Sequence, residues 1–373
     1  MAFLAALPLF VFGGNAYCEE GEVIVTVAPG PYELKQEDGF HEISLAGYGM
    51  DFIPGTPNLP ARIHAIAVPP GAEVTGVSLE AAEAFELPGE FRIRPVPLPR
   101  AVGKDVEKPE LYAKDLALYE ETRERIYGSD EAYPSQLGEL VRTAGYRKYN
   151  LADVRVQPFS YHPKTGKLIY YPKIVINVHY TLPKASLNGP SPEQTYRRDN
   201  LVRTEAVARE LITNYDQAQA WYFEPAASKG LSLYSFVIIT TSSLTSAVQD
   251  LVAWESKKDK TVNVVTTTWI NANYSGYDTA ERIRNFLRDK YPQEEWGIED
   301  VLLVGHYDDV PMRRCNQDLG YGQPETDLYY AELSLPDSES WDKNGDHKWG
   351  SNEDPIDFYS EVNVGRIPWS TVS

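Results

Sequence analysis

The sequence predicts a two-domain α+β chain, in which an antiparallel β-sandwich-like domain precedes an α/β domain whose sheet is mainly parallel. Residues 22–185 contain segments in which apolar and polar side chains alternate, which is typical of half-buried antiparallel strands. After residue 230 the strands become continuous apolar runs separated by helical patterns, which indicates a parallel sheet covered on both faces. A chain of 373 residues with 42% hydrophobic content is long enough to form two cores.

The first segment, residues 1–21, is predicted to be a signal peptide. The run from Met1 to Ala16 is apolar and uncharged, and it is too short to cross a bilayer. Gly14 and Ala16 supply small residues of the kind found at cleavage sites. We therefore expect a secreted or cell-envelope protein with no transmembrane segment in the mature chain.

The β-rich domain is expected to occupy residues 22–185. Residues 23–27 form a β-branched run, which favours a strand. Asp38-Gly39 lies between two further apolar segments and predicts a hairpin turn. Near the end of the domain, residues 174–180 alternate apolar and polar side chains, so they predict another half-buried strand.

The connection between the two domains is expected at residues 186–230, which are mainly polar. A weak helical pattern, rich in alanine, arginine and glutamate, runs through residues 201–222. Exposed polar linkers are where proteases cut most readily, so we expect a protease-sensitive junction within this connector.

The α/β domain is expected to occupy residues 231–373. Its first predicted strand, residues 234–240, is a continuous apolar run, and residues 262–267 and 301–305 supply two more. Helical patterns lie between them, and the second helix begins with a capping box at Asp278. The order βαβαβ predicts a doubly wound sheet.

Charge and cysteine content exclude several classes of protein. The 54 acidic and 35 basic residues leave a formal charge of −19, which repels a phosphate backbone, so no nucleic-acid partner is expected. The two cysteines, Cys18 and Cys315, are too few for a disulfide framework.

An acidic loop near the C-terminus is spaced as a calcium site. Asp342, Asn344 and Asp346 stand at positions 1, 3 and 5 of the loop, the Lys348 carbonyl would stand at position 7, and Glu353 stands at position 12. Calcium prefers six to eight such hard oxygen ligands. Glycine occurs at position 4 instead of 6, so this would be a structural Ca²⁺ loop outside an EF-hand. The alternative is a solvated loop of Asx turns.

Five short segments, in order along the chain, resemble a known family. They are Gly55–Pro60, Ala67–Gly71, Leu302–Gly305, Thr326–Tyr330 and Glu361–Pro368. The first two are similar to the start of the propeptide of gingipain-type cysteine peptidases. The other three are similar to the first half of the peptidase domain of that family.

The resemblance implies a fold and an organisation. Residues 22–185 would be the propeptide domain and 231–373 the N-terminal part of a caspase-like α/β domain, which is therefore expected to be incomplete. Maturation would cut near Lys229-Gly230. The propeptide would be an intramolecular partner, and the substrates would be proteins or peptides.

The resemblance also implies a catalytic Cys-His dyad. In the family the histidine lies in a Gly-His-Gly segment and the cysteine follows a later strand, so both are expected beyond Ser373. We assign no catalytic residue in this chain, and we expect the chain to be inactive alone. His306 and Cys315 form a local alternative, because His306 follows a predicted strand of the doubly wound sheet and Cys315 lies nearby.

Three hypotheses of function follow. The first is the secreted precursor of a cysteine endopeptidase. The second is a non-catalytic, calcium-stabilised, secreted surface module. The third is a processing peptidase of a secretion system, which would use the same chemistry on exported proteins.

Overall fold

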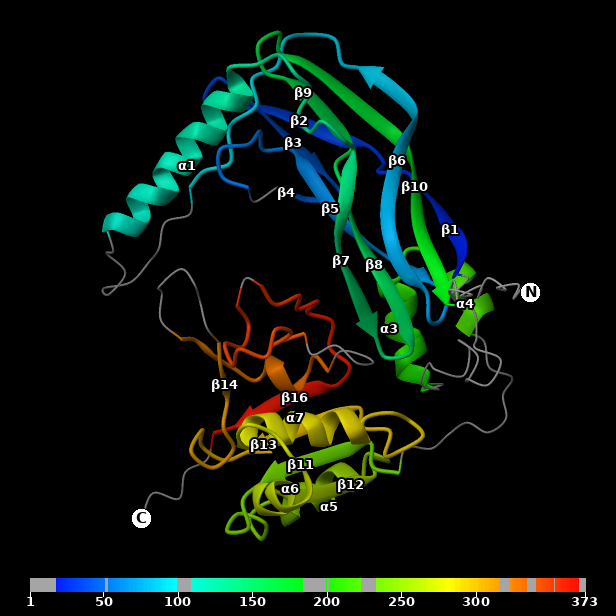
Figure 1. Cartoon of the computed structure of the whole chain (residues 1–373), viewed down its shortest axis with the longest axis vertical. Coiled ribbons are helices and arrows are strands. Elements are labelled where there is room, and N and C mark those ends of the chain that lie inside the picture. Colours follow the sequence, from blue (N-terminus) through cyan, green and yellow to red (C-terminus); the bar gives the residue numbers. More distant parts are fainter. Residues whose placement is uncertain are drawn as a thin grey trace, which may run out of the picture.

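The computed structural model describes residues 18–50, 53–98, 109–183, 199, 201–222, 233–315, 323–333, 340–351 and 353–368. Figure 1 shows an N-terminal part made mostly of long strands and a C-terminal part in which helices cover a smaller sheet. Helix α1 (Pro109–Tyr127) lies to one side of the N-terminal strands. None of the helices in the described ranges is both long and apolar enough to cross a membrane.

Two antiparallel sheets and a hairpin form the N-terminal part. The first sheet contains β1 (Cys18–Val27), β6 (Glu73–Glu86), β9 (Phe159–His162) and β10 (Lys167–Pro183). The second contains β4 (Gly49–Met50), β5 (Pro60–Val68), β7 (Gly138–Tyr146) and β8 (Tyr149–Val156). The hairpin consists of β2 (Tyr32–Glu37) and β3 (Phe40–Leu45).

The alternation in the sequence decides which side chains enter the core. Val23, Val25 and Val27 of β1 are buried, whereas Ile24 between them is 52% exposed. The three valines share one hydrophobic cluster with buried residues of β10 in the same sheet and of β5 and β8 in the other. The two sheets therefore enclose a common core.

The predicted hairpin turn at Asp38-Gly39 joins β2 to β3. Both residues have positive φ angles, 51° and 77°, which is the conformation that a two-residue hairpin turn requires. Gly166 ends the turn between β9 and β10, with φ at 68°. A Cβ atom there would lie 2.9 Å from the Phe91 carbonyl oxygen, so glycine is needed at this position.

Strand β1 begins at Cys18, so it includes the last four residues of the range predicted as signal peptide. Cys18 pairs with Pro183 and Gly21 with Tyr180 at the end of β10. Antiparallel pairing with this long strand extends the sheet beyond the β-branched run that marks it in the sequence.

Residues 201–222 of the predicted connector are packed structure, in contrast to an exposed linker. Helices α3 (Val202–Leu211) and α4 (Tyr215–Tyr222) bury one face against β5 and β8. Asn214, between them, accepts a hydrogen bond from the Ala67 N–H at 2.8 Å and donates one to the Ala67 carbonyl. Apolar residues at helical spacing therefore attach this segment to the N-terminal part. Lys229-Gly230 lies outside the described residues.

The C-terminal part is built on a four-stranded parallel sheet in the order β12-β11-β13-β16. Its strands are β11 (Phe236–Thr240), β12 (Val262–Thr266), β13 (Asp300–Val304) and β16 (Asn363–Ile367). The parallel sheet predicted from the continuous apolar runs is confirmed. The chain passes from β11 to β12 on one side of β11 and then to β13 on its other side. A switch point therefore lies between β11 and β13.

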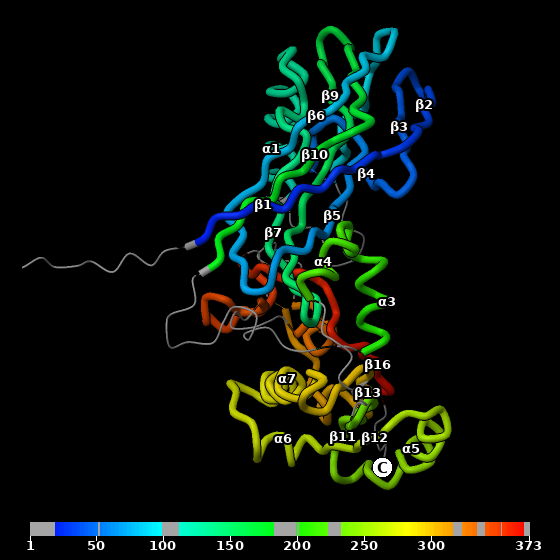
Figure 2. The backbone as a smooth tube through the Cα atoms, turned by 90° about the vertical axis from the view of Figure 1, so that its right-hand side faces the viewer, coloured from blue at the N-terminus to red at the C-terminus, as the bar shows by residue number. Residues whose placement is uncertain are grey.

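Helices cover both faces of this sheet. Helix α7 (Thr279–Lys290) buries Ile283, Phe286 and Leu287 in one cluster with the sheet, and α5 (Gln249–Ser256) packs on the opposite face. Figure 2 shows these helices around the sheet, with the N-terminal strands beyond it. The predicted cap forms, since the Asp278 carboxylate accepts a hydrogen bond from the Glu281 N–H at 2.9 Å.

Irregular segments complete the C-terminal part. Helix α6 (Thr267–Asn273) directly follows β12. The short strands β14 (Arg313–Arg314) and β15 (Glu325–Thr326) pair after β13, and the 3₁₀ helix η1 (Leu328–Tyr330) follows them. The acidic loop then leads to β16.

Candidate functional site

A cleft of about 810 Å³ lies at the carboxyl edge of the parallel sheet. Thr241, Thr267 and Tyr307, which line it, come directly after or soon after β11, β12 and β13. The carboxyl ends of parallel strands at a switch point are where doubly wound folds bind their ligands. The cleft is therefore the candidate functional site.

Arg313 forms one wall of the cleft. Its guanidinium donates to both carboxylate oxygens of Asp278, at 2.9 and 2.7 Å. It also lies 3.8 Å from the ring centroid of Trp349 and 4.5 Å from that of Tyr329. The Arg313 side chain is only 3% exposed, so the bidentate pair and the two rings hold it in one orientation.

Hydrogen bonds decide the direction in which the pKa of Asp278 is shifted. Burial alone would raise the pKa of Asp278, but the hydrogen bonds from Arg313 and from the Glu281 N–H hold it below its usual value. Asp278 therefore stays ionised, and it performs two tasks, since it caps α7 and anchors Arg313.

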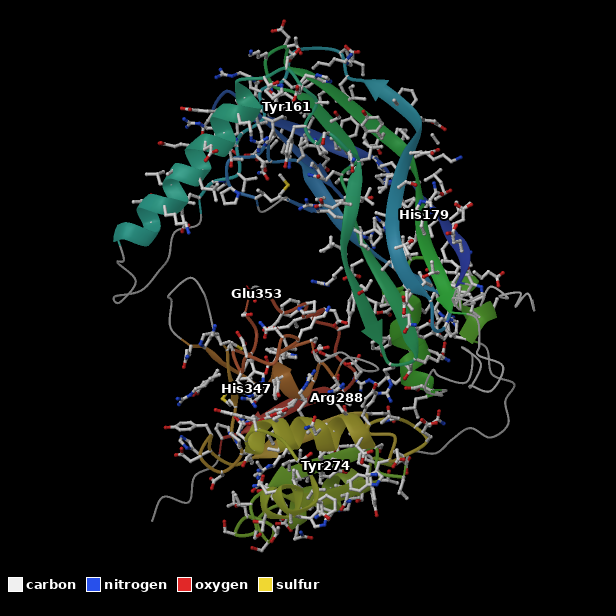
Figure 3. The ribbon with its side chains drawn as sticks, viewed as in Figure 1. Tyr161, His179, Tyr274, Arg288, His347 and Glu353 are labelled. Atoms are coloured by element: carbon white, nitrogen blue, oxygen red, sulfur yellow. The ribbon has the colours of Figure 1, made fainter. Side chains whose placement is uncertain are left out.

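The acidic loop forms another wall of the same cleft. The His347 ring stacks on Tyr277 with the ring centroids 4.2 Å apart, and Trp349 lies on Arg313. Figure 3 labels His347 and Glu353, which lie on this loop of the C-terminal part. The loop predicted as a calcium site is therefore also part of the cleft.

Within the acidic loop, N–H groups donate hydrogen bonds to several of its side-chain carboxylate and amide oxygens. Both oxygens of Asp342 accept from the His347 N–H at 3.2 Å, and Asp346 accepts from the Lys348 N–H at 2.9 Å. The Asn344 carbonyl oxygen accepts from the Asp346 N–H, and its amide donates to Glu353 at 3.2 Å. These are the contacts of an Asx-turn loop. The described residues include no group of three or more His, Cys, Asp or Glu side chains placed to hold a metal ion.

His306 lies in a tight turn after β13. Its Nδ1 atom is 3.1 Å from an oxygen of Asp308, and its backbone N–H donates to Asp309 at 3.3 Å. Gly305 has φ at 141°, and a Cβ atom there would lie 2.9 Å from the Asp309 Cβ, so the turn requires glycine.

Cys315 lies against the acidic loop. A Cβ atom on Gly350 would lie 3.4 Å from its Sγ atom, and the side chain packs on the core that contains Trp341. His306 and Cys315 share no hydrogen bond in the described ranges, and neither side chain lines the cleft.

We expect the Cys315 thiol to be unreactive. Burial raises its pKa, although Arg313 opposes this shift, and nucleophilic cysteines show the reverse. In a Cys18→Ala chain at pH 7, alkylation of Cys315 by iodoacetamide is expected to be at least severalfold slower than alkylation of free cysteine. A rate above that of free cysteine would contradict this assignment.

Sequence reasoning missed the residues that shape the cleft. Asp278 is predicted only as a helix cap, and Arg313, Trp349 and Tyr277 carry no motif. A buried arginine next to two aromatic rings is a tertiary arrangement with no local pattern.

Two family models match the chain in succession. The propeptide model of family C25 matches residues 29–221, just over half of the chain, and the model of peptidase family C25 matches residues 232–373. The chain belongs to peptidase family C25. The resemblance to gingipain-type peptidases with a propeptide is thereby confirmed, and in this C25 chain the cleft lies within the peptidase match.

Gingipains are among the relatives of this C25 chain. Gingipain R2 of Porphyromonas gingivalis is 22% identical over 212 residues, which are 56% of this chain and 27% of that protein. Gingipain R1 of Porphyromonas gingivalis is 22% identical over 220 residues, which are 57% of this chain and 20% of that protein. The chain thus spans about a fifth to a quarter of the length of these relatives.

Two solved structures are also similar. The complex of Porphyromonas gingivalis RgpB pro- and mature domains has a TM-score of 0.33 and 16% identity, covering 55% of this chain and 96% of that one. A structure on the zymogenic latency of gingipain K from Porphyromonas gingivalis has a TM-score of 0.31 and 17% identity, covering 46% of this chain and 95% of that one.

Proposed function

We propose that this chain belongs to the secreted precursor of a gingipain-like cysteine endopeptidase. The observation that carries the proposal is the cleft at the carboxyl edge of a parallel sheet, inside the segment that matches peptidase family C25 and after a matching propeptide. In this proposal residues 22–185 are a sandwich-like propeptide domain and 231–373 are the N-terminal part of a caspase-like domain. Residues 186–230 connect them, and cleavage at Lys229-Gly230 separates them.

The proposed reaction is acyl transfer to water. A cysteine thiolate, whose proton the histidine has taken, attacks the peptide carbonyl, and backbone amides stabilise the oxyanion. The C–N bond breaks, the amine leaves with the proton from the histidine, and water hydrolyses the thioester to release the acid and the cysteine. Proteins or peptides are the proposed substrates. The role of the described residues is to shape the cleft, because Arg313 and Asp278 fix one wall and the acidic loop another.

His306 and Cys315 are not the proposed dyad. His306 is held by Asp308, and Cys315 is a half-buried thiol with a raised pKa. The nucleophile and its base are proposed to be other residues of the whole precursor.

The test uses the full-length precursor, mixed fluorogenic peptides and a reducing agent. We expect turnover that iodoacetamide abolishes, unchanged turnover in the Cys315→Ala variant, and a new N-terminus near Gly230 after incubation. Absence of both turnover and maturation in the reduced precursor would contradict the proposed function. Loss of turnover in the Cys315→Ala variant would instead identify Cys315 as the nucleophile.

Secretion is proposed on the apolar, uncharged run at the N-terminus. Expression with and without residues 1–16 in a Gram-negative host, followed by fractionation, tests this proposal. Equal amounts outside the cytoplasm in both cases would contradict it.

Structural calcium in the acidic loop is a separate proposal. An ion would have to replace the amide hydrogen bonds that Asp342 and Asp346 accept, and in return it would neutralise crowded carboxylates. Binding would stabilise the folded chain by about 3 kcal/mol when free calcium is about a hundredfold above its Kd.

We therefore expect a calcium-dependent rise in Tm that a chelator reverses. The Asp342→Ala/Asp346→Ala double variant should lose this rise, and an exposed-acid variant, Glu295→Ala, should keep it. An unchanged Tm of the wild type on adding chelator would show that the loop is a solvated set of Asx turns.

A further inference from the structure

The turn between β7 and β8 reaches from the N-terminal part into the C-terminal part. At its tip Arg147 has φ at 50° and is only 4% exposed. Its guanidinium forms an ion pair with Asp199, donates to the Glu361 carbonyl at 2.6 Å and to the Tyr291 carbonyl at 3.3 Å, and lies over the Tyr291 ring. Two carbonyl groups of the C-terminal part therefore accept hydrogen bonds from a buried cation of the N-terminal part.

This contact lies at the amino edge of the parallel sheet. Glu361 precedes β16, and Ile298, whose carbonyl also accepts from Arg147 at 3.4 Å, precedes β13. The cleft lies at the carboxyl ends of the same sheet. The N-terminal part therefore holds the sheet at the edge opposite the cleft.

A second set of contacts lies beside the first. The Asp357 carboxylate accepts a hydrogen bond from the Gly145 N–H at 2.8 Å, and the Tyr359 hydroxyl donates to Asp153 at 2.7 Å. Arg142 of β7 pairs with Asp153 at 2.9 Å. Residues 357–359 thus pack against both strands of the hairpin.

The interface buries acids without neutralising all of them. Asp357 and Glu361 are each 4% exposed, and neither forms an ion pair with a residue that the structure describes. Asp357 accepts from the N–H groups of Gly145 and Tyr359, and Glu361 accepts from the Leu333 N–H at 2.6 Å.

The charged groups around these two acids come from both parts. From the C-terminal part the buried Glu332, which is paired with Arg284, faces both acids. From the N-terminal part, Arg142 faces Asp357, and Arg147 with Tyr146 lies beside Glu361. Asp357 itself also repels Glu361, so Glu361 faces two repelling carboxylates and Asp357 faces one, while one cation lies near each acid.

Burial and the neighbouring Glu332 make ionisation unfavourable. Burial, followed by the charge of Glu332, raises the pKa of Asp357 to about 7 and that of Glu361 to about 8. Both pKa values are higher when the two parts are docked than when the acids face water, so protonation of the two acids stabilises the docked state. This stabilisation is fully present below the ordinary carboxyl pKa near 4. It is lost as the pH rises through the docked values.

We propose that the β7–β8 hairpin is a pH-sensitive clasp that holds the N-terminal part on the amino edge of the parallel sheet and loosens as Asp357 and Glu361 ionise. The inference goes beyond the proposed function, since the clasp requires no peptidase activity. Within a precursor, such a clasp would keep the N-terminal part docked at acidic pH and release it toward neutral pH.

Hydrogen exchange on the intact chain tests the clasp. Intrinsic exchange rates are divided out, and protection factors are compared between pH 5.5 and 7.5 for peptides that contain Gly145 and Tyr359. We expect protection there to fall about tenfold or more in the wild type. A peptide from α7 that ends before Tyr291, which Arg147 contacts, serves as the internal reference for global unfolding, and its protection should stay constant.

Variants separate the contribution of the two acids, Asp357 and Glu361, from the contribution of Arg147. The Asp357→Asn/Glu361→Gln double variant removes the ionisable groups, so its protection should no longer depend on pH. The Glu139→Gln variant is the matched control, because Glu139 lies on β7 but is exposed, and it should behave as the wild type. Arg147→Ala should lower protection of both peptides at both pH values.

Several outcomes would overturn the proposal. These are equal protection of the wild type at the two pH values, persistence of the fall in the double variant, and unchanged protection in Arg147→Ala. An equal loss in the α7 peptide would show global unfolding instead of release of the clasp. Since no outcome depends on turnover, failure of the clasp and failure of the proposed peptidase function are distinguishable.

Discussion

Replacing Glu332 by alanine is expected to lower the free energy of unfolding of the C-terminal part by about 3–5 kcal/mol. Glu332 and Arg284 are both fully buried, and their charged groups are 3.4 Å apart. The Glu332 carboxylate also accepts from the Ser340 hydroxyl at 2.7 Å and from the Trp341 indole N–H at 2.5 Å. The substitution leaves the Arg284 charge and two further donors buried without this acceptor.

Urea denaturation monitored by tryptophan fluorescence measures this loss. Glu325→Ala is the matched control, because Glu325 pairs with the exposed Arg314 and a surface pair contributes about 0–1 kcal/mol. A loss below about 1 kcal/mol in Glu332→Ala would show that Arg284 finds another partner or reaches water. The double replacement Arg284→Met/Glu332→Leu should recover much of the loss, because it removes both charges together.

Arg313→Ala is expected to lower the free energy of unfolding by about 2–4 kcal/mol. The variant loses the bidentate pair with Asp278 and the stacking on Trp349 and Tyr329, which together join the start of α7 to the acidic loop. Asp278 is 41% exposed, so water compensates part of the loss, and the effect should be smaller than that of Glu332→Ala.

The neighbouring arginine supplies the control for this second prediction. Arg314 is 66% exposed and pairs with Glu325 on the surface, so Arg314→Ala should change stability by about 0–1 kcal/mol. Arg313→Lys should recover only part of the loss, since lysine keeps the charge but cannot form the planar two-pronged pair. Equal stability of Arg313→Ala and Arg314→Ala in urea would contradict the role of Arg313 in the cleft wall.

The candidate site was only partly predictable. The switch point of the parallel sheet follows from the order of strands and helices, and the cleft is found there. The acidic loop was identified by its spacing, yet the spacing does not say whether its oxygens converge on an ion or accept loop amides. His306 and Cys315 are close in sequence, but the turn after β13 and the packing on Gly350 direct them to different neighbours.

The sequence by itself determined the local elements and the face that each one buries. The valines of β1, the Asp38-Gly39 turn, the Asp278 cap and the apolar run of β11 are all local patterns, because backbone geometry fixes the period of two in strands and the capping of helix ends. Only the tertiary structure decided which segments meet. Arg147 and Glu361 are 214 residues apart, and Gly145 and Asp357 are 212 apart. Contacts over such separations depend on how whole sheets pack. The local sequence around a buried charged residue does not show which distant residue will be its partner.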